Sequence, residues 1–157
     1  MPRADRQVTN REEILKIMDG CDALTLALMD GEYPYTIPMN FGWEDQSGQL
    51  VLYMHGAKEG KKLELIRQNP NAAFSMSRNH RCILGKVACA SLFQYESVCG
   101  RGKIEILEDD ERMHALTVLM RQYDRNQEHV FTQKHAAAVS VLKLTVEEFT
   151  GKRREQK

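Results

Sequence analysis

The chain has 157 residues, 42% of them hydrophobic, and its 22 basic and 22 acidic side chains cancel to a formal net charge of zero. This length suits one domain with its own core, and the neutral balance argues against a nucleic-acid partner. No apolar run is as long as a membrane span, the N-terminus is charged, and the four cysteines lack metal-site spacing. We therefore expect one cytoplasmic domain over residues 1–151, without a metal or membrane contact, and a disordered basic tail at 152–157.

Hydrophobic periodicity predicts short strands interrupted by a few helices. Helical spacing is expected over residues 11–19, 58–68 and 109–120, and strands over 23–29, 33–41, 50–54, 72–76, 95–107 and 139–146. The polar segment 78–86 is predicted to be a surface loop. Hairpin-connected strands with few helices are typical of an antiparallel barrel or sandwich.

The segment from Tyr33 to Phe41 alternates cleanly between two faces. Aromatic and aliphatic side chains share the face expected in the core, whereas Pro34 and Pro38 share the other face. Because proline cannot donate a hydrogen bond to a ladder, we expect part of this strand to lie at a sheet edge or an opening.

The most informative stretch is HGAKEGKKL, from His55 to Leu63, which follows a predicted strand and opens a predicted helix. Its small residues let a ligand approach the backbone, the helix start supplies unpaired N–H donors, and Lys61 and Lys62 add positive charge. The spacing matches neither a Walker loop nor the triple-glycine dinucleotide fingerprint. The stretch therefore indicates a phosphate cradle of another fold or, as the alternative, a solvated helix start.

Four segments stand in an order and at separations that are typical of one protein family. They are Tyr33–Phe41, Leu52–Lys62, Tyr95–Gly102 and Thr150–Lys152. Through them most of the chain resembles the FMN-binding split-barrel proteins related to pyridoxamine 5′-phosphate oxidase, and within these the nitroimidazole-resistance branch. The resemblance implies a mainly β fold, a six-stranded antiparallel Greek-key split β-barrel, and a homodimer that binds FMN at the subunit interface.

The resemblance also implies which residues contact the FMN cofactor, although it assigns no catalytic residue. In chain order they are Pro38, Met39 and Asn40 beside the flavin ring, His55, Gly56 and Ala57 lining the same pocket, Lys61 and Lys62 at the phosphate, and Ser97 and Val98 reaching the flavin of the neighbouring subunit.

Two functions are compatible with these residues. The first is an oxidoreductase in which FMN passes electrons from a reduced nicotinamide to a small aromatic acceptor, a nitro compound or a quinone. The alternative is a non-catalytic module that holds flavin or haem for storage or sensing, with His55 considered as an axial ligand. Oxidation of pyridoxamine phosphate is not expected, because Thr145–Lys157 lacks the histidine of the Arg-x-His element found in those oxidases.

Overall fold

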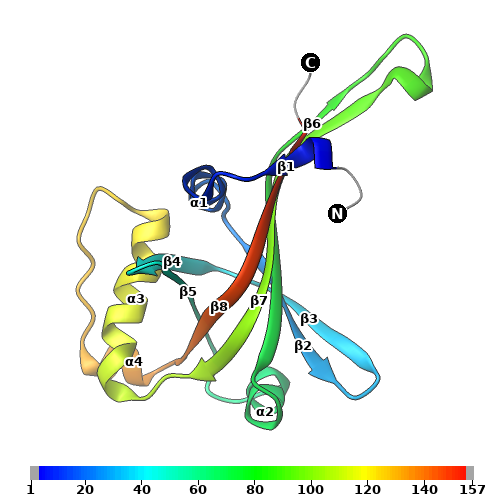
Figure 1. Ribbon diagram of the computed structural model, residues 1–157. Helices are drawn as coiled ribbons and strands as arrows, with labels where there is room; N and C mark the ends of the chain where they lie inside the picture. The colour runs from blue at the N-terminus through cyan, green and yellow to red at the C-terminus, as the bar shows by residue number, and fades with distance from the viewer. Residues whose placement is uncertain (1–3, 155–157) are drawn as a thin grey trace.

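The computed structural model describes residues 4–154, whose strands form one antiparallel sheet that curls into a split barrel (Figure 1). The strands are β1 Gln7–Val8, β2 Leu24–Asp30, β3 Tyr33–Met39, β4 Phe41–Gln46, β5 Gln49–Gly56, β6 Asn71–Ile83, β7 Leu92–Ile106 and β8 Ser140–Arg154. Their order in the sheet is β3-β2-β6-β7-β8-β5-β4, with β1 beside β8. The two outermost strands, β3 and β4, are consecutive in the chain and meet at Asn40.

The predicted fold class is confirmed, but the strand count is not. The described residues form eight strands and not six, because β1 and β4 were not predicted. β1 has only two residues, too few to show a period, and the alternation of β3 continues through the corner at Asn40 into β4.

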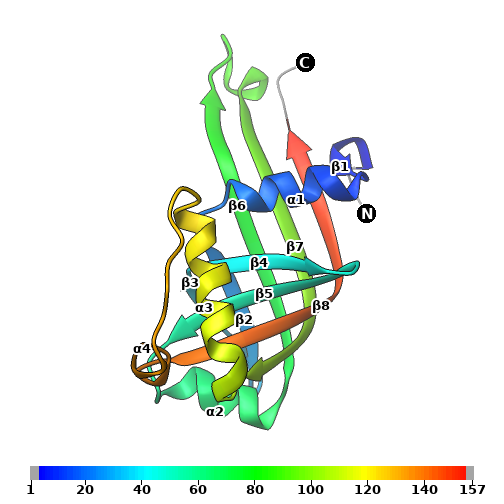
Figure 2. The same cartoon turned by 90° about the vertical axis from the view of Figure 1, so that its left-hand side faces the viewer.

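Helices cover the outside of the barrel, and α3 lies across β4 and β5 (Figure 2). The α-helices are α1 Arg11–Asp19, α2 Lys61–Gln68, α3 Asp109–Tyr123 and α4 Gln133–Ala137, and short 3₁₀ turns occupy Ala4–Arg6 and Ala88–Ala90. None of the helices within residues 4–154 is long and apolar enough to cross a membrane. The predicted bounds of α1 are confirmed, since Asn10 Oδ1 accepts a hydrogen bond from Glu13 N at 3.2 Å and starts the helix there.

The barrel interior is filled by side chains from most strands and from α1 and α2. Phe41, Leu52 and Met54 are completely buried there, and a second apolar cluster under α3 includes Val51 and Tyr53. β5 therefore buries both of its faces, one in the barrel and one under α3. This double burial explains why its sequence is a continuous apolar run without alternation.

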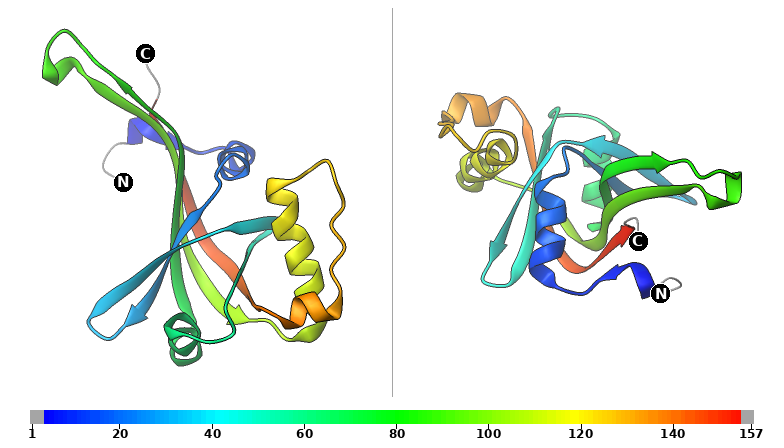
Figure 3. Two further views of the ribbon diagram at one scale, coloured as in Figure 1. Left: turned by 180° about the vertical axis from the view of Figure 1, so that it is seen from behind. Right: turned by 90° about the horizontal axis from the view of Figure 1, so that it is seen from above.

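Two segments that were predicted to be irregular are strands. Residues 78–86 were expected to form a loop, but β6 continues to Ile83 and pairs with β7 in an arm that projects from the barrel (Figure 3). Lys152–Arg154 were expected to begin a disordered tail, but they end β8 and pair with Tyr95–Ser97. The rest of that expected tail, residues 155–157, lies outside the described residues.

Candidate cofactor site

One end of the barrel brings together three of the segments predicted to bind the cofactor. Phe41 pairs with Met54 in the β4–β5 ladder. Because the strands are antiparallel, residues 38–40 and residues 55–57 leave this ladder at the same end. The chain then enters α2, which lies at the end of the barrel opposite the projecting arm (Figure 1).

Lys62 lies directly against Gly56. A Cβ atom added to Gly56 would come within 2.1 Å of Lys62 Nζ and 4.0 Å of Met39 Cε, so a side chain at this position would displace the ammonium. Lys62 is half-buried, and this burial lowers the pKa of its ammonium. Within residues 4–154 the Lys62 side chain has no hydrogen bond or ion pair. Its charge is therefore available to an anion from outside the chain.

His55 contributes a neutral imidazole next to this ammonium. Partial desolvation of the ring and, second, the charge of Lys62 lower the pKa of His55 below its ordinary value. Since that value is about 6.5, the ring is mostly uncharged at neutral pH, with one N–H donor and one acceptor nitrogen. His55 can therefore donate to a ligand or accept from it without adding charge to the site.

Lys61 is in a different state from its neighbour. Its ammonium forms an ion pair with Asp30 at the end of β2, and it lies 5.7 Å from the centre of the Tyr35 ring. The hydrogen bond that the Lys61 ammonium donates to the Asp30 carboxylate is the main reason why the pKa of Lys61 is raised. The predicted basic pair is thus unequal, because Asp30 already balances the charge of Lys61.

The start of α2 leaves backbone donors open. The helix begins at Lys61 and not at the predicted Lys58, because Gly60 adopts a φ of 124°, which interrupts the helical backbone before it. No side chain caps the first turn. An uncapped helix start and an ammonium without a counter-charge, which lies in the space that Gly56 leaves, together fit a phosphate group.

The residues predicted beside the flavin ring have three different environments. Pro38 is exposed on β3, which is an edge strand as its prolines predicted. Met39 is 7% exposed and packs in the core. The Asn40 amide donates to Asp22 O and to Tyr123 Oη, both at 3.2 Å, so this side chain fixes the corner between β3 and β4.

Ser97 and Val98 lie far from this site within one chain. Ser97 pairs with Lys152 on β8, whereas His55 pairs with Val141, 11 residues earlier on the same strand. At about 3.3 Å per residue, the two positions are about 35 Å apart along β8. The Val98 side chain is fully buried in the core. Their contact with a cofactor stays a prediction that requires a second copy of the chain.

Sequence reasoning missed the ion pair between Lys61 and Asp30, which makes Lys61 different from Lys62. Asp30 was interpreted only as part of a hairpin turn, and its partner Lys61 is 31 residues further along the chain. An acidic residue in a hairpin turn gives no sequence signal for such a pair, since turns favour aspartate for local reasons.

Comparison with known proteins assigns the chain to a family. A family model described as pyridoxamine 5′-phosphate oxidase matches residues 10–153. Among solved structures, a candidate 5-nitroimidazole antibiotic resistance protein from Bacteroides thetaiotaomicron is 33% identical with a TM-score of 0.80, and the match covers 94% of this chain and 86% of that one. A search of curated protein sequences found no match.

Two further structures are similar in fold at lower identity. The FAD and heme binding protein from Mycobacterium smegmatis is 24% identical with a TM-score of 0.82, over 96% of this chain and 74% of that one. A flavocytochrome from Azotobacter vinelandii is 17% identical with a TM-score of 0.75, over 96% and 70%. With a family model that spans most of its length and a relative that is one-third identical, the chain belongs to the pyridoxamine 5′-phosphate oxidase-like family of split-barrel proteins.

Proposed function

We propose that the protein is an FMN-dependent oxidoreductase that passes electrons from a reduced nicotinamide to a small aromatic acceptor, a nitro compound or a quinone. The observation that carries this proposal is the half-buried ammonium of Lys62, which lies against Gly56 beside an uncapped helix start. The named relatives support it, since one is described as a nitroimidazole resistance protein and others as flavin-containing proteins.

Each residue at this end of the barrel has a role in the proposal. Lys62 and the first-turn N–H groups of α2 hold the phosphate, because together they can neutralise a dianion. Gly56 leaves room for the Lys62 ammonium, Ala57 adds only a methyl group at the strand end, and the edge of β3 at Pro38 is open to a planar ring. The neutral His55 imidazole can donate a hydrogen bond to a bound ligand from its N–H group. Bound FMN would supply the redox chemistry itself.

The test is anaerobic reduction of the FMN-loaded protein by a reduced nicotinamide. Prompt bleaching of the yellow colour supports an oxidoreductase, whereas flavin that stays oxidised supports a storage or sensing module.

FMN at a hundredfold excess over its Kd should stabilise the fold by about 2.7 kcal/mol, and riboflavin at equal concentration much less. Equal thermal shifts from the two ligands would contradict the phosphate cradle, and a haem spectrum in the protein as isolated would favour the alternative module.

We further propose that the protein is a homodimer in which β7 of one copy reaches the cofactor of the other. The reason is the distance within one chain, since Ser97 pairs with β8 at Lys152, 11 residues along that strand from Val141, which pairs with His55. Sedimentation at micromolar concentration should give twice the 18.0 kDa mass of the chain. A monomer that still binds FMN tightly would refute the dimer without affecting the phosphate cradle.

A further inference from the structure

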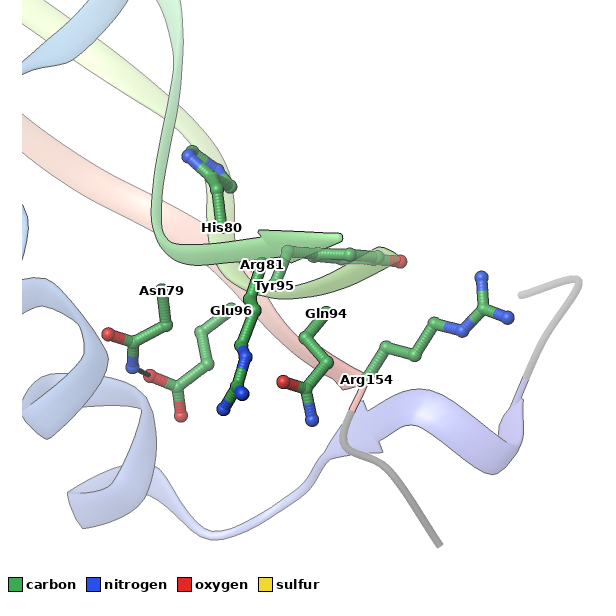
Figure 4. A pocket seen from close by; sticks show the side chains of 7 residues that line it. All are labelled: Asn79, His80, Arg81, Gln94, Tyr95, Glu96 and Arg154. Carbon is green, nitrogen blue, oxygen red and sulfur yellow. Dashed lines mark hydrogen bonds between the residues drawn. The ribbon is translucent and has the colours of Figure 1, made fainter. Parts of the chain in front are cut away.

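One cavity outside the candidate cofactor site lies beneath the projecting arm and is lined by residues of β6, β7 and β8 (Figure 4). Arg81 pairs across the arm with Gln94. Arg154 pairs with the next residue of β7, Tyr95. Because successive residues of a strand point to opposite faces, the two guanidinium groups lie on opposite faces of the sheet. This cavity therefore does not bring its cations to one ligand.

The one acidic side chain that lines this cavity is already balanced within the protein. Glu96 accepts hydrogen bonds from Arg78 Nε at 2.7 Å, Asn79 Nδ2 at 2.6 Å and Arg153 Nε at 2.6 Å. Burial alone would raise the pKa of Glu96, but the two guanidinium groups outweigh it and hold the pKa below its ordinary value. The carboxylate therefore stays ionised and joins β6 and β8 to β7, which is a structural role.

A second cavity, at the open edge of β4, has side chains that do converge. Its volume is about 370 Å³, within the roughly 300–1,000 Å³ that small-molecule sites occupy. It lies between the end of α1, β4 and the end of α3, and its lining residues are Asp19, Trp43, Val118, Arg121, Gln122 and Arg125. None of them belongs to the candidate cofactor site.

Hydrogen bonds show that side chains from all three elements meet at this cavity. Asp19 Oδ1 accepts from Trp43 Nε1 at 3.2 Å and from Arg125 Nη2 at 2.9 Å. Gln122 Nε2 donates to three backbone carbonyl groups at the end of α1 and just after it. Because β4 is the outermost strand of the sheet, the ends of α1 and α3 can meet beyond its edge.

The end of α3 presents its lining residues on one face. Arg121 and Gln122 follow Val118 by three and four positions, which places the three side chains together on a helix of 3.6 residues per turn. Gly42 lets α3 approach β4 closely, since a Cβ atom added there would come within 2.4 Å of Leu119 Cα. This close approach brings the face of α3 next to Trp43.

Three charged side chains line the cavity, and Arg121 has no partner for its charge. Asp19 and Arg125 form an ion pair. Arg121 also lines a smaller cavity with Asp124 and Glu128, but within residues 4–154 it forms no hydrogen bond or ion pair with these or other residues. Two arginines and one aspartate leave the larger cavity with one net positive charge.

We infer that this cavity binds a small aromatic carboxylate, with the carboxylate on Arg121 and the ring against Trp43. A guanidinium group binds a carboxylate through two parallel hydrogen bonds, and one net positive charge suits a monoanion. The indole N–H of the half-buried Trp43 is already bonded to Asp19, so its apolar ring is what remains for a ligand. The buried Val118 adds an apolar wall.

Trp43 is the only tryptophan of the chain, so its fluorescence reports directly on this cavity. The experiment is titration of the purified full-length protein with benzoate, with and without bound FMN. Benzoate should change the Trp43 emission in a saturable way in both states. Cyclohexanecarboxylate has the same charge without an aromatic ring, and benzamide has the ring without a charge, so both should bind more weakly than benzoate.

Arg121→Gln should weaken benzoate binding about tenfold or more, because hydrogen bonds to a charged group are lost. Arg121 is exposed, so the Tm of the variant should equal that of wild type. Arg67→Gln is the matched control, since it removes the same charge from an exposed position on α2 and should leave benzoate affinity unchanged.

Three results would overturn the inference. They are the absence of a saturable change in Trp43 emission at millimolar benzoate, equal weakening by Arg67→Gln and Arg121→Gln, and equal affinity for benzoate and either of its two analogues. The inference does not depend on the proposed function. A protein that binds benzoate but is not reduced by a nicotinamide would keep the cavity assignment and refute the oxidoreductase, and the opposite pair of results would do the reverse.

Discussion

Replacement of Lys62 by alanine is expected to weaken FMN binding about tenfold to a hundredfold, since a hydrogen bond to a charged phosphate is worth roughly 1.5–3 kcal/mol. Lys61→Ala should weaken binding only a few fold, because the Lys61 ammonium is already paired with Asp30. This result would differ from the sequence-based expectation that both lysines hold the phosphate. Quenching of flavin fluorescence on titration of the apo-protein measures both affinities.

Lys58→Ala is the matched control for this comparison. Lys58 is exposed and lies before Gly60, outside the first turn of α2, so its loss should leave FMN affinity unchanged. The apo-protein should stay as stable as wild type in the Lys62 variant, because within residues 4–154 no partner loses a bond. If Lys58→Ala or Lys61→Ala proves the most damaging, the phosphate does not lie against Gly56.

Replacement of Glu96 by alanine is expected to lower the free energy of unfolding by about 3 kcal/mol, the lower end for breaking a buried ion pair. The side chains of Arg78 and Arg153 are each 29% exposed, and both lose the Glu96 carboxylate in the variant, whereas Arg153 still pairs with Glu13. Urea unfolding measures the difference. Glu148→Ala is the control, since its ion pair with Arg101 is largely exposed and should contribute less than about 1 kcal/mol.

The stabilisation of the fold by Glu96 should decrease as the pH falls. The folded pKa of Glu96 is lower than its ordinary value of about 4.3, which the unfolded chain retains. The stabilisation is therefore complete above that unfolded pKa and is lost as the pH falls through the folded pKa. Unfolding curves of wild type and Glu96→Ala should converge in acid. A difference that stays constant from neutral pH to acid would show that the carboxylate charge does not stabilise the fold.

Local sequence signals made α1 and β5 predictable, whereas the projecting arm of β6 and β7 could not be predicted in full. Asn10 caps α1 with a hydrogen bond to a residue three positions away, and β5 is apolar because both of its faces are buried. The outer part of β6 exposes both faces to solvent, so its residues 78–83 lack the alternation that marks a strand. Arg153 was placed in a tail because the carboxylates that hold it in β8, Glu13 and Glu96, are 140 and 57 residues away.

The candidate site, too, was predictable only where its sequence features are local. Sequence reasoning found the segment from His55 to Lys62, because small residues, a helix start and adjacent lysines are local features. It could not tell Lys61 from Lys62, since the difference depends on Asp30 in a distant hairpin.

The position of β3 at the outer edge of the sheet has a consequence for solubility. An unpaired edge strand exposes a row of N–H and C=O groups to which a strand from another molecule can add, and this is a common start of aggregation. The backbone N–H and C=O groups of every second residue of β3 point outward from this edge. Pro34 and Pro38 hold two of those positions, and proline has no N–H group to donate. The protein can thus leave one sheet edge uncovered without polymerising through it.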